Sequence, residues 1–148
     1  MSGPGQQVGD QMQDFLERTP YVRFLGFKAE LEGDLLIAQL PFSDHLVGNT
    51  FIPALHGGVI GAFLEMTALA QLFIVQPPGP RPKTIDVTIE YLKPGRAQTS
   101  YARAQVRKIG RRIANVHVDA WQEDPAQPFA ALRGHFLLSS EDAPPAPS

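Results

Sequence analysis

One carboxylate stands alone in the least polar stretch of this sequence. Between His56 and Arg81 the only ionisable side chain is Glu65, within a run rich in Leu, Phe, Val and Ile. An unpaired carboxylate is costly to bury, so such a group is normally neutralised, paired or used in chemistry. We therefore treat Glu65 as a candidate catalytic carboxylate. The alternative is that it reaches a solvent edge or pairs with an arginine where two copies meet.

A histidine and two glycines, His56-Gly57-Gly58, stand at the start of the same run. A helix is predicted to begin here, and a helix N-terminus presents unpaired N–H groups and a partial positive charge. Glycine lets a carbonyl group approach that backbone closely. The pattern indicates a place for an anion or a developing oxyanion. The plainer interpretation is a turn in which His56 packs or caps the helix.

Small residues lead from this entrance to the carboxylate. Gly58, Gly61, Ala62 and Glu65 share one face of the helix by their spacing. Because the first three have little or no side chain, a thin ligand could lie along this face and reach Glu65. Close packing against another segment needs the same small residues, so the sequence leaves both interpretations open.

Four cations surround one predicted hairpin turn. They are Arg107, Lys108, Arg111 and Arg112. The usual interpretation is a solvated hairpin tip. The alternative is a clamp for a phosphorylated ligand, because arginine matches phosphate oxygens in a bidentate geometry.

Composition excludes several classes of function. The 148 residues carry 13 Lys and Arg against 15 Asp and Glu. The chain therefore lacks the excess of positive charge that binding to nucleic acid requires. There is no cysteine, and the four histidines lack metal-ligand spacing, so we expect neither a metal nor a cofactor. His45, His117 and His135 are interpreted as ordinary hydrogen-bonded residues. No secretion signal is visible, and Glu65 and Gln71 interrupt the most apolar run, so we expect a cytoplasmic protein without a membrane partner.

The apolar pattern predicts two strands, one buried helix and four further antiparallel strands in a single domain over residues 9–139. The long helix, from Gly57 to about Val75, is apolar on all sides. One sheet covers only one side of it, so we expect a second copy to cover the rest in an obligate dimer at least. Residues 1–8 are expected to be a flexible leader and 140–148 a Pro-rich disordered tail. The other elements are predicted as a helix at Asp10–Arg18 and strands at Phe24–Leu31, Leu35–Leu40, Thr84–Tyr91, Ser100–Ile109, Arg112–Trp121 and Phe129–Leu138.

The strand after the long helix is predicted to alternate strictly. Ile85, Val87, Ile89 and Tyr91 fall on one face, and Thr84 falls on the other. This alternation is typical of a strand with one face toward a core.

Three segments together resemble a known family. They are Asn49 with His56-Gly57-Gly58 and Glu65, the strand TIDVTIEYLKP at residues 84–94, and Gly110-Arg111-Arg112. Together they resemble the hotdog-fold acyl-CoA thioesterases of the PaaI-like, phenylacetate-degradation-type branch. The resemblance covers roughly Tyr21 to Leu138.

The resemblance implies an α+β fold in which a curved antiparallel sheet wraps a long central helix, with the sheets joined across a homodimer or homotetramer and the active sites between subunits. It implies that Glu65 acts on an acyl- or aryl-CoA thioester as general base or nucleophile. The Gly57 amide would polarise the carbonyl, and Asn49 would orient the carbonyl or the water. His56 would support the substrate or the loop that carries Asn49, and Thr84 would come from the neighbouring subunit to help hold the water. Coenzyme A enters only as part of the substrate, with its phosphates at the basic hairpin.

Two other functions remain open at this point. One is a hotdog hydratase or dehydratase with His45 and Glu65 as the acid–base pair. The other is a non-catalytic acyl-CoA binding or sensing module, in which Glu65 has no chemical role. The identity of the acyl group is not readable from the sequence.

Overall fold

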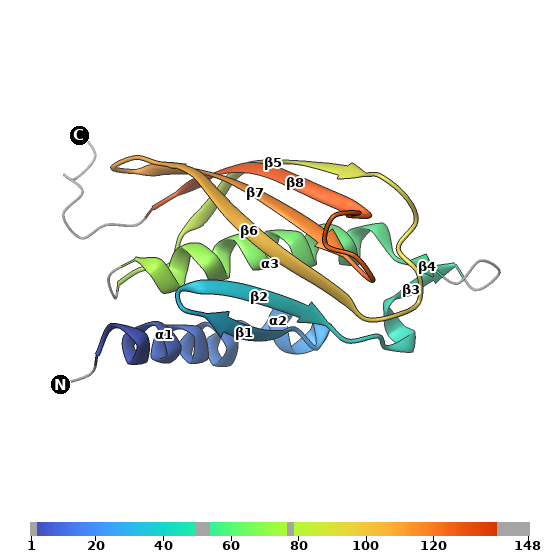
Figure 1. Cartoon of the computed structure of the whole chain (residues 1–148), viewed down its shortest axis with the longest axis horizontal. Helices are drawn as coiled ribbons and strands as arrows, with labels where there is room; N and C mark the ends of the chain where they lie inside the picture. Colours follow the sequence, from blue (N-terminus) through green and yellow to red (C-terminus); the bar gives the residue numbers. More distant parts are fainter. Residues whose placement is uncertain (1–2, 50–53, 77–78, 139–148) are drawn as a thin grey trace.

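The computed structural model describes residues 3–49, 54–76 and 79–138 of the chain. Its centre is one long helix, α3 (Gly57–Val75), wrapped by a curved sheet (Figure 1). The sheet is antiparallel throughout, in the order β1-β2-β6-β7-β8-β5. Its strands are β1 (Lys28–Glu32), β2 (Leu35–Leu40), β5 (Lys83–Tyr91), β6 (Ser100–Ile109), β7 (Ile113–Trp121) and β8 (Ala130–Leu137). The expected α+β arrangement of a helix inside a curved antiparallel sheet is confirmed.

A row of alanines crosses the sheet beside the helix. Ala38, Ala102, Ala120 and Ala130 pair in turn across β2, β6, β7 and β8, and each is 0% exposed. Because alanine adds only a methyl group, it lets a helix lie close to the sheet at this row. The large apolar side chains of α3, such as Phe63, are fully buried in the same core. Burial of such side chains supplies most of the driving force for folding.

A second helix of the same chain covers part of the face of α3 that the sheet leaves free. This helix, α1 (Pro4–Arg18), packs along α3, and Phe15 lies with its ring 5.9 Å from the ring of Phe73. The Gln11 amide donates to the carbonyl of Gln76 at 2.6 Å, which satisfies a backbone acceptor at the C-terminus of α3. Not all of the apolar surface of α3 therefore needs a second copy to cover it, contrary to the reasoning from the sequence.

Several boundaries differ from those predicted. Helix α1 begins at Pro4, so residues 4–8 are helical rather than part of a flexible leader; proline is favoured in the first turn of a helix. The predicted strand at Phe24–Leu31 begins only at Lys28, because α2 (Pro20–Leu25) ends at Gly26 with a φ of 75°. The expected tail at 140–148 lies outside the described residues.

The segment before α3 is not a plain loop. It contains η1 (Asp44–Leu46) and the two-stranded ribbon of β3 (Val47–Asn49) and β4 (Ala54–Leu55). The backbone N–H of His56 donates to the carbonyl of Leu46 at 2.8 Å. This bond ties the start of α3 to η1.

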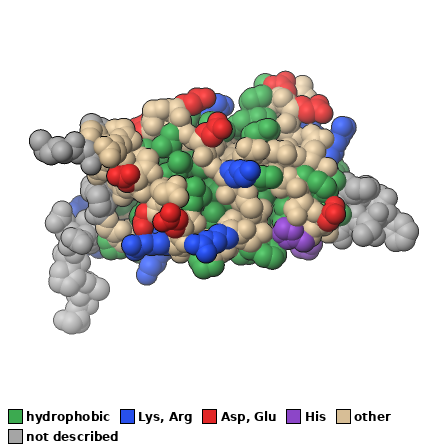
Figure 2. Space-filling model, turned by 90° about the horizontal axis from the view of Figure 1, so that it is seen from below, with side chains coloured by type: hydrophobic (Ala, Val, Ile, Leu, Met, Phe, Trp, Pro, Cys, Tyr) green, Lys and Arg blue, Asp and Glu red, His purple; other side chains and the backbone are tan. Residues whose placement is uncertain are grey.

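Among the described helices, α3 alone is long and apolar enough to cross a membrane by length and composition, and 67% of the qualifying window is buried inside the protein. The core helix of a folded domain meets the same criterion, so this is weak evidence for a membrane span. The face seen from below intersperses acidic and basic side chains with hydrophobic ones (Figure 2). Tyr21 and Phe24 of α2 are among the exposed hydrophobic residues, at 43% and 57%.

Candidate active site

Glu65 lies half-buried in the middle of α3, where one of its oxygens is held. The hydroxyl of Thr84 donates to Glu65 Oε2 at 2.6 Å. The other oxygen, Oε1, has no hydrogen-bond partner among the described residues. Glu65 is thus a carboxylate with one oxygen fixed and one available, which is the arrangement that a general base or nucleophile requires.

A β-bulge turns Thr84 toward Glu65. Thr84 pairs with Phe136 of β8 while Asp86 pairs with the adjacent His135, so Ile85 is one residue more than β8 can match. The extra residue breaks the predicted alternation: Thr84 faces α3, and Ile85 is 50% exposed. Strict alternation was wrong at this end of the strand.

The contact between Thr84 and Glu65 forms within one chain, which corrects the implication that Thr84 would come from the neighbouring subunit. The reason is the path of the chain, because β5 follows α3 after a short connection and runs back along it. Near the other end of β5, the hydroxyl of Tyr91 donates to the carbonyl of Gly57 at 2.9 Å. Strand β5 therefore spans the helix from its start to Glu65.

The start of α3 combines a cap with an open amide. His56 is the N-cap, and its Nδ1 accepts a hydrogen bond from the Gly58 amide at 3.0 Å. With Nδ1 as the acceptor, the proton of the neutral ring lies on Nε2. The Gly57 amide, at the first helical position, donates to no described residue, and Gly57 is exposed. Its N–H is available to a carbonyl oxygen.

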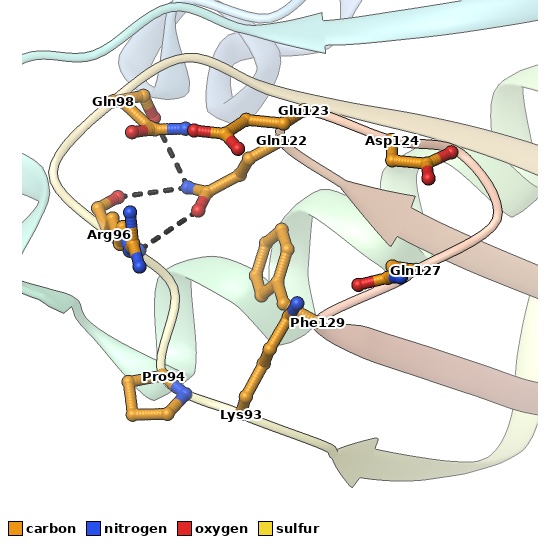
Figure 3. A pocket seen from close by; sticks show the side chains of 9 residues that line it. All are labelled: Lys93, Pro94, Arg96, Gln98, Gln122, Glu123, Asp124, Gln127 and Phe129. Carbon is orange, nitrogen blue, oxygen red and sulfur yellow. Dashed lines mark hydrogen bonds between the residues drawn. The ribbon is translucent and has the colours of Figure 1, made fainter.

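The loop that supports this entrance is held by one glutamine. The Gln122 side chain accepts from the Arg96 amide at 3.1 Å and donates to the Arg96 carbonyl at 2.9 Å, beside a polar cavity of about 120 Å³ (Figure 3). In the same loop the Gly95 carbonyl accepts from the Leu55 amide at 2.9 Å. Gln122 thus fixes a loop that fixes the residue before His56, a role that the sequence did not reveal.

The small residues on α3 divide into two groups. A Cβ on Gly61 would lie 2.8 Å from Cδ1 of Ile89, so Gly61 allows β5 to pack closely, and a Cβ on Gly58 would meet the His56 ring at 3.1 Å. Ala62 instead belongs to a row of half-buried apolar residues that flanks Glu65, which we call the open stripe. The open stripe comprises Val59, Ala62, Met66 and Leu69.

Three of the four hairpin cations line one open cavity. Lys108, Arg111 and Arg112 surround a volume of about 580 Å³ together with Asn115 and His135. Within the described part of the chain, none of the three forms a salt bridge. Arg107 does not line this cavity, and its guanidinium donates to Gln105 at 3.2 Å.

His117 lies half-buried in β7. This strand pairs with β6, which carries Arg107. Burial, followed by the positive charges of Arg107 and Arg133, lowers the pKa of His117 from its usual 6.5, against the opposing effect of Asp119. Because the folded state binds this proton less well than the unfolded chain, stability falls as the pH drops below about 6.5.

We expect the Tm of His117→Gln to fall less than the Tm of the wild type when the pH is lowered from about 7 to about 5. Identical Tm profiles would contradict this. In an NMR titration, Arg107→Gln should raise the pKa of His117.

Two predicted residues receive no support as catalytic groups from this geometry. Both ring nitrogens of His45 are engaged, Nδ1 with the Ser43 hydroxyl at 2.7 Å and Nε2 with the Phe24 carbonyl at 3.1 Å. His45 therefore has no nitrogen free for acid–base work in a hydratase. Asn49 ends β3, but its side chain lies outside what the structure describes, so its predicted role stays a prediction.

The comparisons with known proteins agree with this fold. A model of the thioesterase superfamily matches residues 53–129. The chain belongs to the thioesterase superfamily, which confirms the predicted family and the predicted enzyme class.

Particular relatives are similar over most of the chain. A protein of Salmonella typhimurium named medium/long-chain acyl-CoA thioesterase YigI is 30% identical over 125 residues, spanning 74% of this chain and 80% of that protein. A crystal structure from Chromobacterium violaceum is 36% identical with a TM-score of 0.72, covering 93% of this chain and 99% of that chain. The E. coli PaaI protein from the phenylacetic acid degradation operon, at 17% identity and a TM-score of 0.80 over 93% of this chain and 97% of its own, shares the fold.

Proposed function

We propose that the protein hydrolyses acyl-CoA thioesters to a free acid and coenzyme A, with Glu65 as the catalytic carboxylate. The observation that carries this proposal is a half-buried carboxylate with one oxygen held by Thr84 and the other bonded to no described residue. As a general base, Glu65 accepts a proton from water while the water oxygen bonds to the thioester carbon. The tetrahedral intermediate then collapses, the C–S bond breaks, and the coenzyme A thiolate takes up the proton.

A helix start supports the other half of the reaction. The Gly57 amide is open and lies where a helix N-terminus favours negative charge, so it can donate to the carbonyl oxygen as that oxygen becomes an oxyanion. Removing such a donor commonly costs about 3 kcal/mol of transition-state stabilisation. The proton on His56 Nε2 offers a further hydrogen bond to the substrate.

We assign the Glu65 carboxylate and the Gly57 amide of one site to the α3 helices of two different protomers. At about 1.5 Å of rise per residue, Glu65 lies about 12 Å along the axis from Gly57. Free N–H groups point beyond the helix N-terminus, away from Glu65, so an oxygen bound there would lie further still. One thioester would meet both groups only if Gly57 of one protomer faced Glu65 of its partner. An isologous dimer makes that pairing twice.

A homodimer also accounts for surfaces that a single chain leaves open. The second copy would lie over the open stripe beside Glu65, with the acyl chain in the seam between the two copies, and over the free edge of β5, the strand at one end of the sheet. Unpaired strand edges and apolar stripes both favour association. Whether dimers pair further into tetramers does not alter the composition of the site.

Residues of two kinds define the substrate class. The open stripe is aliphatic and follows the helix past Glu65, which suits a medium or long acyl chain, as the name of the Salmonella relative also indicates for that protein. Lys108, Arg111 and Arg112 are suited to the phosphates of coenzyme A. A preference for aliphatic over aryl thioesters follows.

The test is a panel of thioesters. We expect thiol release from acetyl-, butyryl-, octanoyl-, palmitoyl-, phenylacetyl- and hydroxybenzoyl-CoA, with the highest kcat/KM for the octanoyl and palmitoyl esters. A higher value for the aryl esters would overturn the proposed substrate class. No turnover of any ester, together with a rise in Tm on adding acyl-CoA, would show a binding module instead.

A further inference from the structure

Gly134 of β8 lies one residue pair beyond the bulge that turns Thr84, next to His135, which pairs with Asp86. Gly134 pairs with Val87 of β5 on one side and with Val116 of β7 on the other. A Cβ at Gly134 would lie 2.8 Å from the backbone carbonyl oxygen of Asp86 and 2.9 Å from Cγ1 of Val87. Cβ atoms are essentially never found this close to a neighbouring atom, and a backbone oxygen cannot rotate away as the tip of a side chain can.

Asp86 contacts β8 through both its backbone and its side chain. Its carbonyl occupies the space that a side chain at position 134 would need, and its carboxylate lies 3.0 Å from Nδ1 of His135, the next residue of β8. Both contacts involve the residue that follows the unmatched Ile85. Two residues of β8 thus fix the bulge. Gly134 leaves the space that the Asp86 carbonyl fills, and His135 contacts the Asp86 carboxylate.

The orientation of Thr84 depends on this anchor. Val87 and Ile89 face α3, so a regular strand would direct Thr84 to the opposite face, where Asp86 lies. The extra residue of the bulge brings Thr84 to the helix side, with its hydroxyl 2.6 Å from Glu65 Oε2. Bulges next to functional sites commonly re-aim a side chain in this way.

We propose that Gly134 is a positioning residue for the catalytic carboxylate. Its lack of a Cβ admits the Asp86 carbonyl, the close approach keeps the bulge, and the bulge holds the Thr84 hydroxyl on Glu65. The proposal rests on the proposed function for its effect on turnover, while its effect on the contact between Thr84 and Glu65 is independent of any reaction.

The experiment is a double-mutant cycle with Gly134→Ala and Thr84→Val. We expect each single variant to lower kcat about tenfold to a hundredfold with little change in KM, as for the loss of one hydrogen bond to a charged group. Because both act on the same contact, the double variant should be no slower than the slower single variant. A further loss of similar size in the Thr84→Val background would overturn the proposal.

A matched control separates positioning from general destabilisation. Leu132→Val removes a buried methylene group from the same strand, since Leu132 is 1% exposed, and Leu132 pairs with Ile89 of β5, four residues beyond the unmatched Ile85. It should lower Tm and leave kcat unchanged. A kcat loss in Leu132→Val equal to that in Gly134→Ala would also overturn the proposal.

Two further measurements do not need turnover. The NMR chemical shift of the Glu65 carboxyl carbon should move in Gly134→Ala as it does in Thr84→Val, and an unchanged shift would contradict the proposal. If the shift moves but no acyl-CoA is hydrolysed even by the wild type, the proposed function fails and the positioning role stands. Should Gly134→Ala fold poorly, deletion of Ile85 should restore its Tm, because a regular strand leaves room for the Cβ; no restoration would contradict the role of the bulge.

Discussion

Glu65→Gln should lower kcat for thioester hydrolysis by about 100- to 10,000-fold, the usual contribution of a positioned general base. Glutamine keeps the shape of the side chain, and its carbonyl oxygen still accepts the hydrogen bond that Thr84 donates. What it loses is the ability to take a proton from water or to attack a carbonyl carbon. KM and Tm should therefore stay close to the wild-type values.

The matched control for this variant is Glu30→Gln, which neutralises an exposed carboxylate on β1. It changes the net charge equally and should leave kcat unaltered. Steady-state kinetics with a saturating aliphatic acyl-CoA, together with thermal unfolding, checks both variants. Activity of Glu65→Gln within a few-fold of the wild type would remove Glu65 from the mechanism.

Gly57→Pro should lower kcat by about 100- to 1,000-fold, because it deletes the one N–H that we assign to the oxyanion. The substitution suits the backbone: proline is favoured at the first helical position, and His56 before it has the extended conformation that proline prefers, with φ −62° and ψ 133°. The Gly57 amide makes no hydrogen bond to a described residue, so folding loses little. Circular dichroism and Tm should match the wild type while turnover falls.

Gly57→Ala is the control for this variant, because it retains the N–H and adds a carbon to the same position. A Cβ there would lie 3.7 Å from the Tyr91 hydroxyl, an ordinary van der Waals distance. Its kcat should stay within a few-fold of the wild type. Equal losses in Gly57→Ala and Gly57→Pro would show that space, and not the amide, matters at this position.

Mixing the two inactive variants tests where the halves of the site come from. A dimer of one Glu65→Gln chain and one Gly57→Pro chain would hold one intact site if the site spans two protomers, and none if each chain is self-sufficient. Random exchange of subunits should then restore about a quarter of the wild-type activity. No recovery in proven mixed dimers would place the whole site in one chain.

The long helix and the lone carboxylate in it were predictable because they depend on local properties of the chain. An apolar run between a glycine pair and a proline cluster makes a helix wherever it lies, and Glu65 is conspicuous in it on polarity alone. The capping bond from the Gly58 amide to His56 spans only neighbouring residues. The strands of the sheet followed from alternation, since a half-buried strand must repeat every second residue.

Other features depend on segments far apart in the sequence. Helix α1 extends beyond its predicted start because it packs against α3, and no pattern within residues 4–8 shows that surface. Gln122 is an ordinary polar residue until the fold brings the Arg96 loop within hydrogen-bond distance of it. One signal was visible: a lone glycine in a predicted strand, Gly134, is a common mark of a bulge.

Residue types and local periodicity were enough to single out Glu65, Gly57 and the thioester chemistry that they suit, because an isolated charge in an apolar helix is evident from the order of residues alone. The direction in which Thr84 points was decided only in the folded chain. It depends on whether β8, some fifty residues further on, leaves space for one carbonyl group. Local alternation assigned Thr84 to the wrong face because the register of a strand is a property of the pair of strands and not of either one.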